Sequence, residues 1–502
     1  MKKRSLFWRA IEIFPGSLAW GGLILPVVLS FYIPAAVTVY ILIFNFYWLL
    51  RAIYMSSCLL RSYKRMKTAL RTDYFDRLQK LPKDNPVIID HREIYHTVLF
   101  ATFGEELETL LPSVESVVAN HWPNDKKIIG LAGESRDSER LHRIGSYLKE
   151  RFKDKLYDFL IFEHPDGIVG EVRGKGAGLH FAGKKLSEYV AAKGLDEEKM
   201  IVYGADADTR FPEQFFACVA NEFVTNPNRH RRSYQPIPLY SNNIWYAPTI
   251  SRLTAWGSSF WQMIEASRPW RLVNFSTHCY SLKMLREMNY WAVDVVNEDS
   301  RQFWRAYFAF EGDHKAVPID LPIYLDAVLA ENFWMTMKNQ YLQKRRWAYG
   351  VEHLPYIVTE SIKHKEIPFW DKFTKTWRLI EGSYSWATVS IYIMFVGWLP
   401  FVASPDYRST VLAYNFPEFS RVILGMAWIG LLTSIFISLS FLPPKPKWIK
   451  STRYLVHVMD WIVFPFSAIF YGSIPALEAQ TRLMFGKYLT FWVTPKKQVK
   501  KS

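Results

Sequence analysis

Long apolar segments gather near both ends of the chain and flank a charged middle region, and this arrangement limits the possible folds more than any other feature. Apolar segments of this length are typical of transmembrane helices, whereas the middle region has the composition of a soluble domain. We therefore expect an integral membrane protein with a soluble domain inserted between its membrane helices. The main apolar segments cover about residues 18–31, 34–50, 384–403, 422–442 and 454–492.

The first apolar segment follows the basic residues MKKR, as the apolar core of a signal peptide does. The second begins directly behind it at Pro34, which favours a retained hairpin. Residues 454–492 lie between a lysine-rich loop and a lysine-rich tail, so they must leave and return to one side of the membrane. Either two crossings or a re-entrant segment broken near Pro475 would satisfy this, for a total of about five or six crossings.

Basic residues adjoin the apolar segments, and the chain carries a net charge of +15. Cytoplasmic loops of membrane proteins carry such an excess of Lys and Arg, so we expect a plasma or inner membrane protein whose soluble domain is cytoplasmic. We expect membrane lipids as partners and no nucleic acid, because zinc-finger spacings and long basic tracts are absent from the sequence. The three cysteines, Cys58, Cys218 and Cys279, are too few for a disulfide framework, which favours a reducing compartment.

The middle of the chain alternates apolar strand patterns with amphipathic helix patterns from about His96 onward. TVLFATF, KIIGLAG, YDFLIF and MIVYGAD are strand candidates, and the first two are each followed by a helical pattern. This alternation predicts an α/β domain with a mainly parallel sheet flanked by helices, and ligands at the carboxyl ends of the strands.

Together these patterns divide the chain into six parts. Residues 57–95 begin with basic, amphipathic sequence, which is typical of a segment on the membrane surface, and residues 369–381 are amphipathic and aromatic. The predicted parts are a transmembrane hairpin (1–56), an interfacial linker (57–95), the α/β domain (96–360), an interfacial helix (361–383), C-terminal transmembrane helices (384–490) and a basic tail with a further motif (491–502).

Two acidic side chains, Asp206 and Asp208, stand at the end of the predicted strand in IVYGADADTRFP. Carboxylates at this spacing can share a divalent cation and, through it, a diphosphate. The alternative is a solvated turn with two incidental acids. The apolar strand before the pair favours the metal site.

A second acidic pair, Glu298 and Asp299, lies in VVNEDSRQFW. A carboxylate near a metal–diphosphate site can act as a general base for an attacking hydroxyl. The same residues also match the first turn of a helix, where acids are common, and taken alone they favour that interpretation.

Two cationic segments complete the pattern. RGKGAGLH places Lys175 in a glycine-rich turn that could face a phosphate or simply precede a helix. In QKRRWAYG, Arg346 can form forked contacts with phosphate, Trp347 offers an apolar face to a sugar, and Gln343 can orient hydroxyls. The alternative there is a basic helix resting on lipid headgroups.

In this order, the Asp-x-Asp, Glu-Asp and QxxRW motifs resemble those of the membrane-embedded family 2 glycosyltransferases, which include cellulose, chitin and hyaluronan synthases. The resemblance covers about residues 98–496 and extends to FWVTPK, which is similar to the FxVTxK gating loop of cellulose synthase-like enzymes. It implies a GT-A-like catalytic domain, a UDP- or GDP-hexose donor and Mg²⁺ or Mn²⁺ as cofactor.

The resemblance also implies roles for individual residues. Asp299 would be the catalytic base, Asp208 the metal ligand, and Asp206 its partner on the nucleotide side. The nucleotide and diphosphate would contact Lys175, Arg346 and Glu134, with Thr494 and Lys496 from the gating loop. The acceptor would contact Gln343, Trp347 and Glu298. The gating loop itself would comprise Phe491, Val493, Thr494 and Lys496.

Three segments depart from the family pattern. AGESRD stands where the family has a DDGS turn, which leaves Glu134 as the nearest acid for the nucleotide. Asn297 replaces the usual Thr, His180 replaces an Asn, and residues 277–281 replace a glycine-rich segment near the acceptor. These departures concern nucleotide preference and acceptor geometry more than the type of reaction.

The resemblance thus predicts an inverting hexosyltransferase that extends a polysaccharide and moves it across the membrane. Transfer of one sugar to a lipid acceptor is the alternative within the same chemistry, and an inactive membrane scaffold is the alternative outside it. Glucose, N-acetylglucosamine and mannose donors all fit these motifs. Because the sequence ends soon after FWVTPK, we expect any regulatory domain to belong to a partner.

Overall fold

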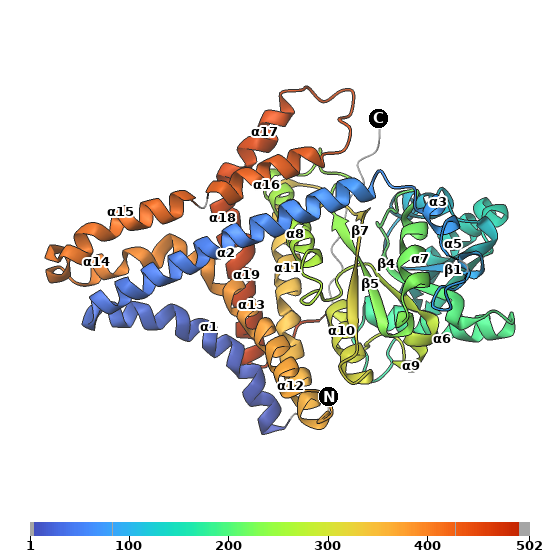
Figure 1. Cartoon of the computed structure of the whole chain (residues 1–502), viewed down its shortest axis with the longest axis horizontal. Helices are drawn as coiled ribbons and strands as arrows, with labels where there is room; N and C mark the ends of the chain where they lie inside the picture. The colour runs from blue at the N-terminus through green and yellow to red at the C-terminus, as the bar shows by residue number, and fades with distance from the viewer. Residues whose placement is uncertain (1–4, 83, 427, 491–502) are drawn as a thin grey trace.

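The computed structural model describes residues 5–82, 84–426 and 428–490. It consists of an α/β domain and a long helical extension, joined by a layer of helices that belongs to both (Figure 1). The α/β domain lies at one end of the molecule, and the tips of two helical hairpins lie at the other. The predicted order of apolar helices, soluble domain and apolar helices is therefore confirmed.

Seven strands form one sheet in the order β3-β2-β1-β4-β6-β5-β7. The pairs β1–β2, β1–β4, β2–β3 and β5–β7 are parallel, and only β6 runs antiparallel to its neighbours β4 and β5. This mainly parallel mixed sheet confirms the predicted fold class. The strands are β1 (Tyr95–Ala101), β2 (Lys127–Glu134), β3 (Asp158–His164), β4 (Met200–Asp206), β5 (Arg232–Leu239), β6 (His278–Ser281) and β7 (Lys315–Tyr324).

Helices cover both faces of the sheet, and the alternation of side chains along β1 shows the two layers. Val98 and Phe100 pack into the larger core, whereas Leu99 between them packs into the smaller one. A strand buried on both faces reads as a continuous apolar run, as TVLFATF does. The helices of this domain are α4 (Leu107–Val118), α5 (Ser138–Phe152), α6 (Lys175–Ala192), α7 (Phe215–Thr225), α8 (Thr249–Ala266), α9 (Leu282–Glu287), α10 (Glu298–Ala309), α11 (Phe333–Ala348) and α12 (Leu354–Lys363).

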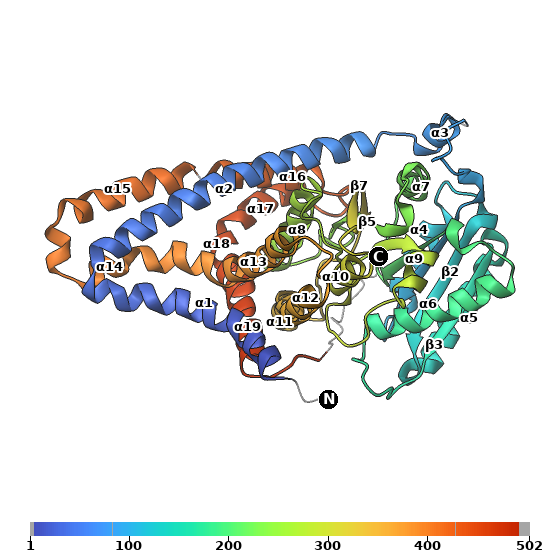
Figure 2. The ribbon, with the colours of Figure 1, turned by 60° about the horizontal axis from the view of Figure 1, so that its bottom comes forward.

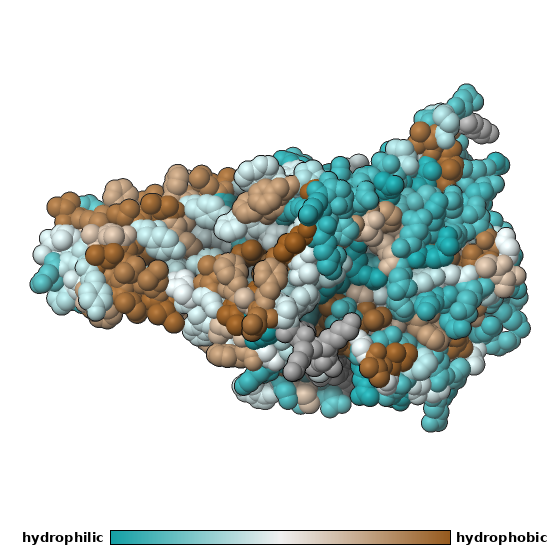
Figure 3. All heavy atoms as spheres, turned by 90° about the horizontal axis from the view of Figure 1, so that it is seen from below, coloured by the Kyte–Doolittle hydropathy of each residue, from teal (hydrophilic) through white to brown (hydrophobic). Residues whose placement is uncertain are grey.

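The helical extension consists of two long hairpins whose outer faces are apolar. Figure 3 shows hydrophobic side chains gathered over the extension and mainly hydrophilic ones over the α/β domain. Among the described residues, five helical segments are long and apolar enough to cross a membrane: Leu6–Tyr32, Pro34–Ala69, Phe369–Ala403, Val411–Ser440 and Arg453–Met484. The helices of the hairpins are α1 (Leu6–Tyr32), α2 (Pro34–Ala69), α13 (Phe369–Phe395), α14 (Leu399–Ala403), α15 (Val411–Met426) and α16 (Trp428–Ser440).

Helix α2 runs without a break from the tip of the first hairpin to the α/β domain. It begins at Pro34, where a proline suits the first turn of a helix and disfavours helical backbone at Ile33 before it. No Gly or Pro interrupts residues 35–69, so the helix continues through the predicted boundary at residues 56–57. Arg65 on its last turns donates to Asp320 of β7 at 2.8 Å, which ties the helix to the sheet. The short helix α3 (Tyr74–Gln79) follows.

The last described helices run across the long axis of the extension, between it and the α/β domain (Figures 1 and 2). These are α17 (Arg453–Met459), α18 (Phe464–Ala468) and α19 (Ile474–Met484). Helix α19 packs against α1 and α11, and Arg9 of α1 donates to the backbone oxygen of Met484 at 2.9 Å. The sequence did not decide between two crossings and a re-entrant segment for residues 454–492. As far as residue 490, the structure shows a broken helix that runs across the bundle.

Candidate active site

The candidate site begins at the carboxyl end of β4, where Asp206 is the last strand residue. Lys175 opens helix α6 directly after Gly174, whose φ of +142° suits glycine. The Lys175 Nζ donates to Oδ1 of Asp206 at 2.8 Å and to the backbone oxygen of Ser276 at 3.0 Å. The predicted phosphate-binding lysine and the first predicted acid therefore meet at one edge of the sheet.

Ser276, just before β6, joins the two acidic motifs. Its hydroxyl donates to Oδ2 of Asp206 at 2.6 Å, and its backbone N–H donates to Oδ2 of Asp299 at 2.8 Å. The residue has a φ of +54°, a left-handed conformation that is uncommon for residues other than glycine. Sequence reasoning did not select Ser276; the only signal was its position beside the segment that departs from the family pattern.

Glu298 and Asp299 occupy the first turn of α10, as the helix-start interpretation expects, but they also face the site. Glu298 is only 4% exposed, and its Oε1 lies 3.9 Å from Lys175 Nζ. Burial and the neighbouring charge of Asp299 raise the pKa of Glu298 above its ordinary range. Oδ1 of Asp299 accepts the backbone N–H of Ser300 at 2.7 Å, so both carboxylate oxygens of Asp299 are held by amides.

The segment behind the QxxRW helix supports the start of α10. Oε1 of Glu352 accepts the backbone N–H groups of Val296 at 3.1 Å and Asn297 at 3.3 Å. Asn297 makes no side-chain cap on α10; its side-chain amide instead donates to the backbone oxygen of Arg346 at 3.0 Å. The catalytic-base candidate and the QxxRW motif are thus connected through backbone groups, and Glu352 is a second residue that the sequence did not reveal.

Asp208 lies deeper than Asp206. It is buried, and its Oδ2 accepts the backbone N–H of Asp326 at 2.8 Å, from the loop after β7. Burial, and after it the charges of Asp206, Asp208 and Asp299, raise the pKa of Tyr240, so both acidic motifs act on this side chain. The cluster draws on the ends of β4, β5 and β7 and on the start of α10.

The QxxRW residues lie on α11 beside this cluster. Gln343 is buried, and the Trp347 ring packs against Tyr240 and Phe275 at centroid distances of 6.0 and 5.5 Å. The positive charge of Arg346 opposes the rise in the pKa of Glu298, which places the guanidinium near the site. Trp347 therefore forms part of the aromatic wall next to the acids.

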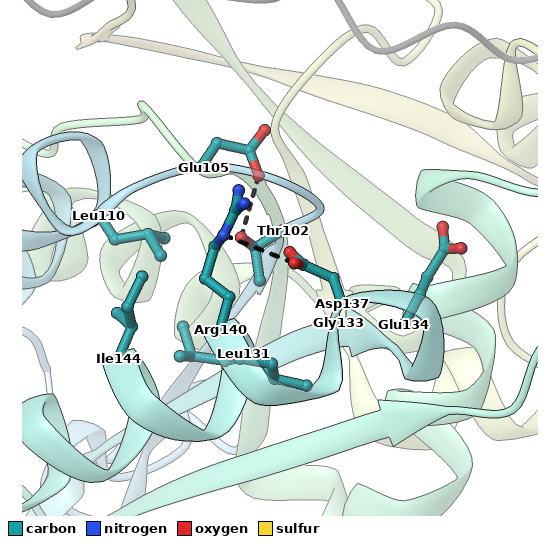
Figure 4. Close-up of a pocket in the computed structure, with 10 residues that line it drawn as sticks. Thr102, Glu105, Leu110, Leu131, Gly133, Glu134, Asp137, Arg140 and Ile144 are labelled. Atoms are coloured by element: carbon teal, nitrogen blue, oxygen red, sulfur yellow. Dashed lines mark hydrogen bonds and ion pairs between the residues drawn. The ribbon is translucent and has the colours of Figure 1, made fainter.

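Glu134 lies apart, at the end of β2. Its carboxylate pairs with Arg136, and it is one of ten residues around a small hollow between β1, β2 and α5. Figure 4 shows Arg140 reaching into this hollow toward Asp137, with Glu134 at the rim beyond Asp137. The hollow lies at the same edge of the sheet as the acidic cluster, since β1 runs parallel to both β2 and β4.

The donor chemistry at β4 suits a divalent cation that is bound together with a substrate. Among the residues the structure describes, no three His, Cys, Asp or Glu side chains are close enough to hold a metal by themselves. Mg²⁺ is commonly held by one or two protein carboxylates together with substrate phosphates, and Asp206 and Asp208 offer that donor set. The gating-loop residues Phe491, Val493, Thr494 and Lys496 lie outside the described ranges.

Comparisons with known proteins give distant structural likenesses only. No family model and no curated protein sequence matches the chain. The mannosyltransferase PcManGT from Pyrobaculum calidifontis, in complex with GDP-Man and Mn²⁺, aligns over 77% of this chain and 99% of its own, with 14% identity and a TM-score of 0.39. TarS 1-349 from S. aureus, in complex with UDP-GlcNAc, covers 67% of this chain and 91% of its own, with 12% identity and a TM-score of 0.29. GalNAc-T7 with UDP, GalNAc and Mn²⁺ covers 57% of this chain and 54% of its own, with 11% identity and a TM-score of 0.28.

Proposed function

We propose that the protein is a membrane-bound inverting glycosyltransferase that uses a nucleotide-diphosphate sugar. The observation that carries this proposal is the junction at Ser276, which joins the metal-binding candidate Asp206 to the base candidate Asp299. Lys175 completes the junction through Asp206 and the Ser276 carbonyl. A cation, a pair of acids for a metal and a separate base are groups that can assist transfer from a diphosphate.

In the proposed reaction Asp299 takes the proton from an acceptor hydroxyl. The hydroxyl oxygen then forms a bond to the anomeric carbon as the bond from that carbon to the diphosphate breaks on the opposite face, so the configuration inverts. The amides of Ser276 and Ser300 each donate to one oxygen of Asp299, which fixes the direction in which the carboxylate points.

The departing diphosphate gains negative charge, and the site supplies cations to stabilise it. Lys175 is held at the site by Asp206, and the positive charge of Arg346 acts on Glu298. When bound at Asp206 and Asp208, Mg²⁺ or Mn²⁺ would neutralise part of this charge. Glu134, Thr494 and Lys496 remain predicted nucleotide contacts.

The growing polysaccharide remains the acceptor predicted from the sequence. A second candidate is a lipid acceptor, which is favoured by the course of the last helices. Because α17–α19 lie across the extension, the four other apolar segments form a bundle of two hairpins (Figures 1 and 2). Such a small bundle suits access for a lipid better than a polysaccharide channel. We expect the α/β domain to face the cytoplasm in either case.

The proposal is tested by donor turnover with purified protein in nanodiscs. UDP- and GDP-sugars would be screened with Mg²⁺ or Mn²⁺, and the products would be sized. We expect metal-dependent release of nucleoside diphosphate that falls about 10³-fold or more in Asp299→Asn and is unchanged in the exposed control Asp294→Asn.

A long glycan product would support the polysaccharide synthase, and a singly glycosylated lipid would support the second candidate. Turnover that survives in Asp299→Asn would remove the assigned base. If no donor is turned over, the hypothesis of an inactive membrane scaffold would be the one that remains.

A further inference from the structure

Lys344 lies where three helices from different parts of the chain meet. Its Nζ donates to Ser258 Oγ of α8 at 3.0 Å and lies 4.9 Å from the ring centroid of Trp347 on its own helix, α11. It also lies 5.7 Å from the ring centroid of Trp386 on α13. Helices α8, α11 and α13 come together between the sheet and the apolar extension (Figures 1 and 2).

The side chain of Lys344 is half-buried, and no carboxylate among the described residues forms an ion pair with it. Burial alone lowers the pKa of Lys344 to about 8. Two lysines with less exposure are compensated differently: Lys175 pairs with Asp206, and the buried Lys127 donates to two backbone oxygens at and after the end of α4. Buried cations are normally paired, because their desolvation is costly.

The surroundings of Lys344 suit an anion that arrives from outside the chain. An ammonium has three donors, and Ser258 takes one of them. Ser258 directs its own hydroxyl hydrogen to the Thr254 carbonyl at 2.8 Å, so it accepts from Lys344 and offers no negative charge. The two indole rings stabilise a cation by their faces but cannot neutralise it.

The position of the site indicates where that anion comes from. Trp386 is 36% exposed and belongs to Phe369–Ala403, one of the segments apolar enough to cross a membrane. On the other side, Trp347 packs against Tyr240, a side chain on which the charges of the candidate active-site carboxylates act. Lys344 therefore stands between the apolar surface and the reacting groups.

We propose that Lys344, with Ser258 and Trp386, binds the phosphate or diphosphate headgroup of a lipid-linked acceptor that reaches the active site along α13. This inference rests on the proposed glycosyl transfer and specifies the chemical class of its acceptor. The lipid chain would lie against the apolar face of α13, and the acceptor hydroxyl would extend past Trp347 toward Asp299. A neutral glycan would leave Lys344 without a counter-charge.

The test uses the full-length protein in nanodiscs and three probes: farnesyl diphosphate, farnesol and inorganic pyrophosphate. We expect farnesyl diphosphate to bind and to raise the thermal midpoint, with a Kd that increases about tenfold or more in Lys344→Gln. Lys338→Gln, an exposed lysine on the same helix, is the matched control and should leave this Kd unchanged. Lys344→Gln should fold with an equal or higher midpoint, because it removes a buried charge.

Each other outcome has a definite meaning. An equal Kd for farnesyl diphosphate in wild type and Lys344→Gln would overturn the inference, as would an absence of binding. Inorganic pyrophosphate that binds with the same dependence on Lys344 would assign the site to a free diphosphate and overturn the lipid source. Farnesol that binds equally well would show that the headgroup is not recognised.

Nucleotide-sugar turnover, measured on the same preparations, separates this inference from the proposed function. If nucleotide sugars are turned over but the Kd for farnesyl diphosphate does not depend on Lys344, the inference about the acceptor is wrong and the proposed glycosyltransferase activity is supported. If lipid binding depends on Lys344 and no nucleotide sugar is turned over, the anionic-lipid site is supported and the proposed glycosyltransferase activity is wrong.

Discussion

The backbone N–H of Ser276 donates a 2.8 Å hydrogen bond to Oδ2 of Asp299, and so a residue before β6 sets the direction of a side chain at the start of α10. The hydroxyl of the same serine holds Asp206 on β4. Movement of the loop at Ser276 would therefore displace both carboxylates together. We regard this loop as the part of the site whose geometry matters most.

Substitutions at Ser276 separate its hydroxyl from its backbone conformation. Ser276→Ala and Ser276→Gly both remove the hydrogen bond to Asp206, so turnover should fall about tenfold in each. Only Gly accepts the φ of +54° without cost, so the Gly variant should be more stable than the Ala variant by about 0.5–1 kcal/mol. Steady-state kinetics and thermal unfolding measure the two effects. Equal midpoints would contradict the strained conformation.

Glu352 makes the stability of the protein depend on pH. Burial raises its pKa from 4.5 to about 7, so the folded state holds a proton that the unfolded state has lost. That contribution is fully present below pH 4.5 and is lost as pH rises to about 7. Glu352→Gln keeps an acceptor for Val296 and Asn297 without titrating. The midpoint of the variant minus that of wild type should rise between pH 4.5 and 7 and then level off; a flat difference would contradict the raised pKa.

The ion pair between Arg252 and Asp460 connects α8 to the turn between α17 and α18. The two side chains are 2% and 4% exposed and form two contacts, at 2.5 and 2.7 Å. Arg252→Met leaves Asp460 buried without its partner and should cost about 3–5 kcal/mol, whereas Arg252→Met with Asp460→Leu should recover much of the loss. Thermal unfolding in nanodiscs checks both. A double variant as unstable as the single one would show that the pair itself stabilises the junction.

Removal of the metal should weaken nucleotide binding, and this effect should depend on Asp208, the predicted metal ligand. EDTA should raise the Kd for UDP or GDP about tenfold in wild type, because the cation bridges carboxylate and diphosphate. The same treatment should have little effect in Asp208→Asn, in which the cation site is already impaired. Isothermal titration calorimetry measures both constants. An equal response to EDTA in the two proteins would place the metal elsewhere.

Residues at the ends of strands could be predicted from the sequence. Asp206 follows an apolar run, so it was expected at the carboxyl edge of a parallel sheet, where the structure places it. Lys175 was predicted in a glycine-rich turn that could face a phosphate or precede a helix, and it begins α6 in the structure. Glu298 and Asp299 were ambiguous because a helix start and an active site use the same residue types. In the structure they begin α10, and their side chains also turn toward Lys175 and Ser276.

Residues that act through loop backbone could not be predicted. Ser276 contributes an amide and a left-handed conformation, and Glu352 contributes an acceptor for two amides, none of which has a sequence signature. The short antiparallel strand β6 was not predicted either, because four residues are too few to show the alternation of apolar and polar side chains that marks a strand. The aromatic-rich segment at residues 240–263 has a composition typical of membrane-interface sequence, yet most of α8 within it is buried against α2, β5 and neighbouring helices.

The bond from Arg9 to the Met484 carbonyl joins residues 475 positions apart in the chain. A ribosome that adds roughly 5–20 residues per second needs about 25–95 s to make the segment between them. Throughout that time α1 must wait without α19, and α11, which is made later, must wait for the rest of that time without the helix it packs against. We therefore expect the proposed activity to be absent from a nascent chain until α17–α19, the helices that lie across the extension, have been synthesised.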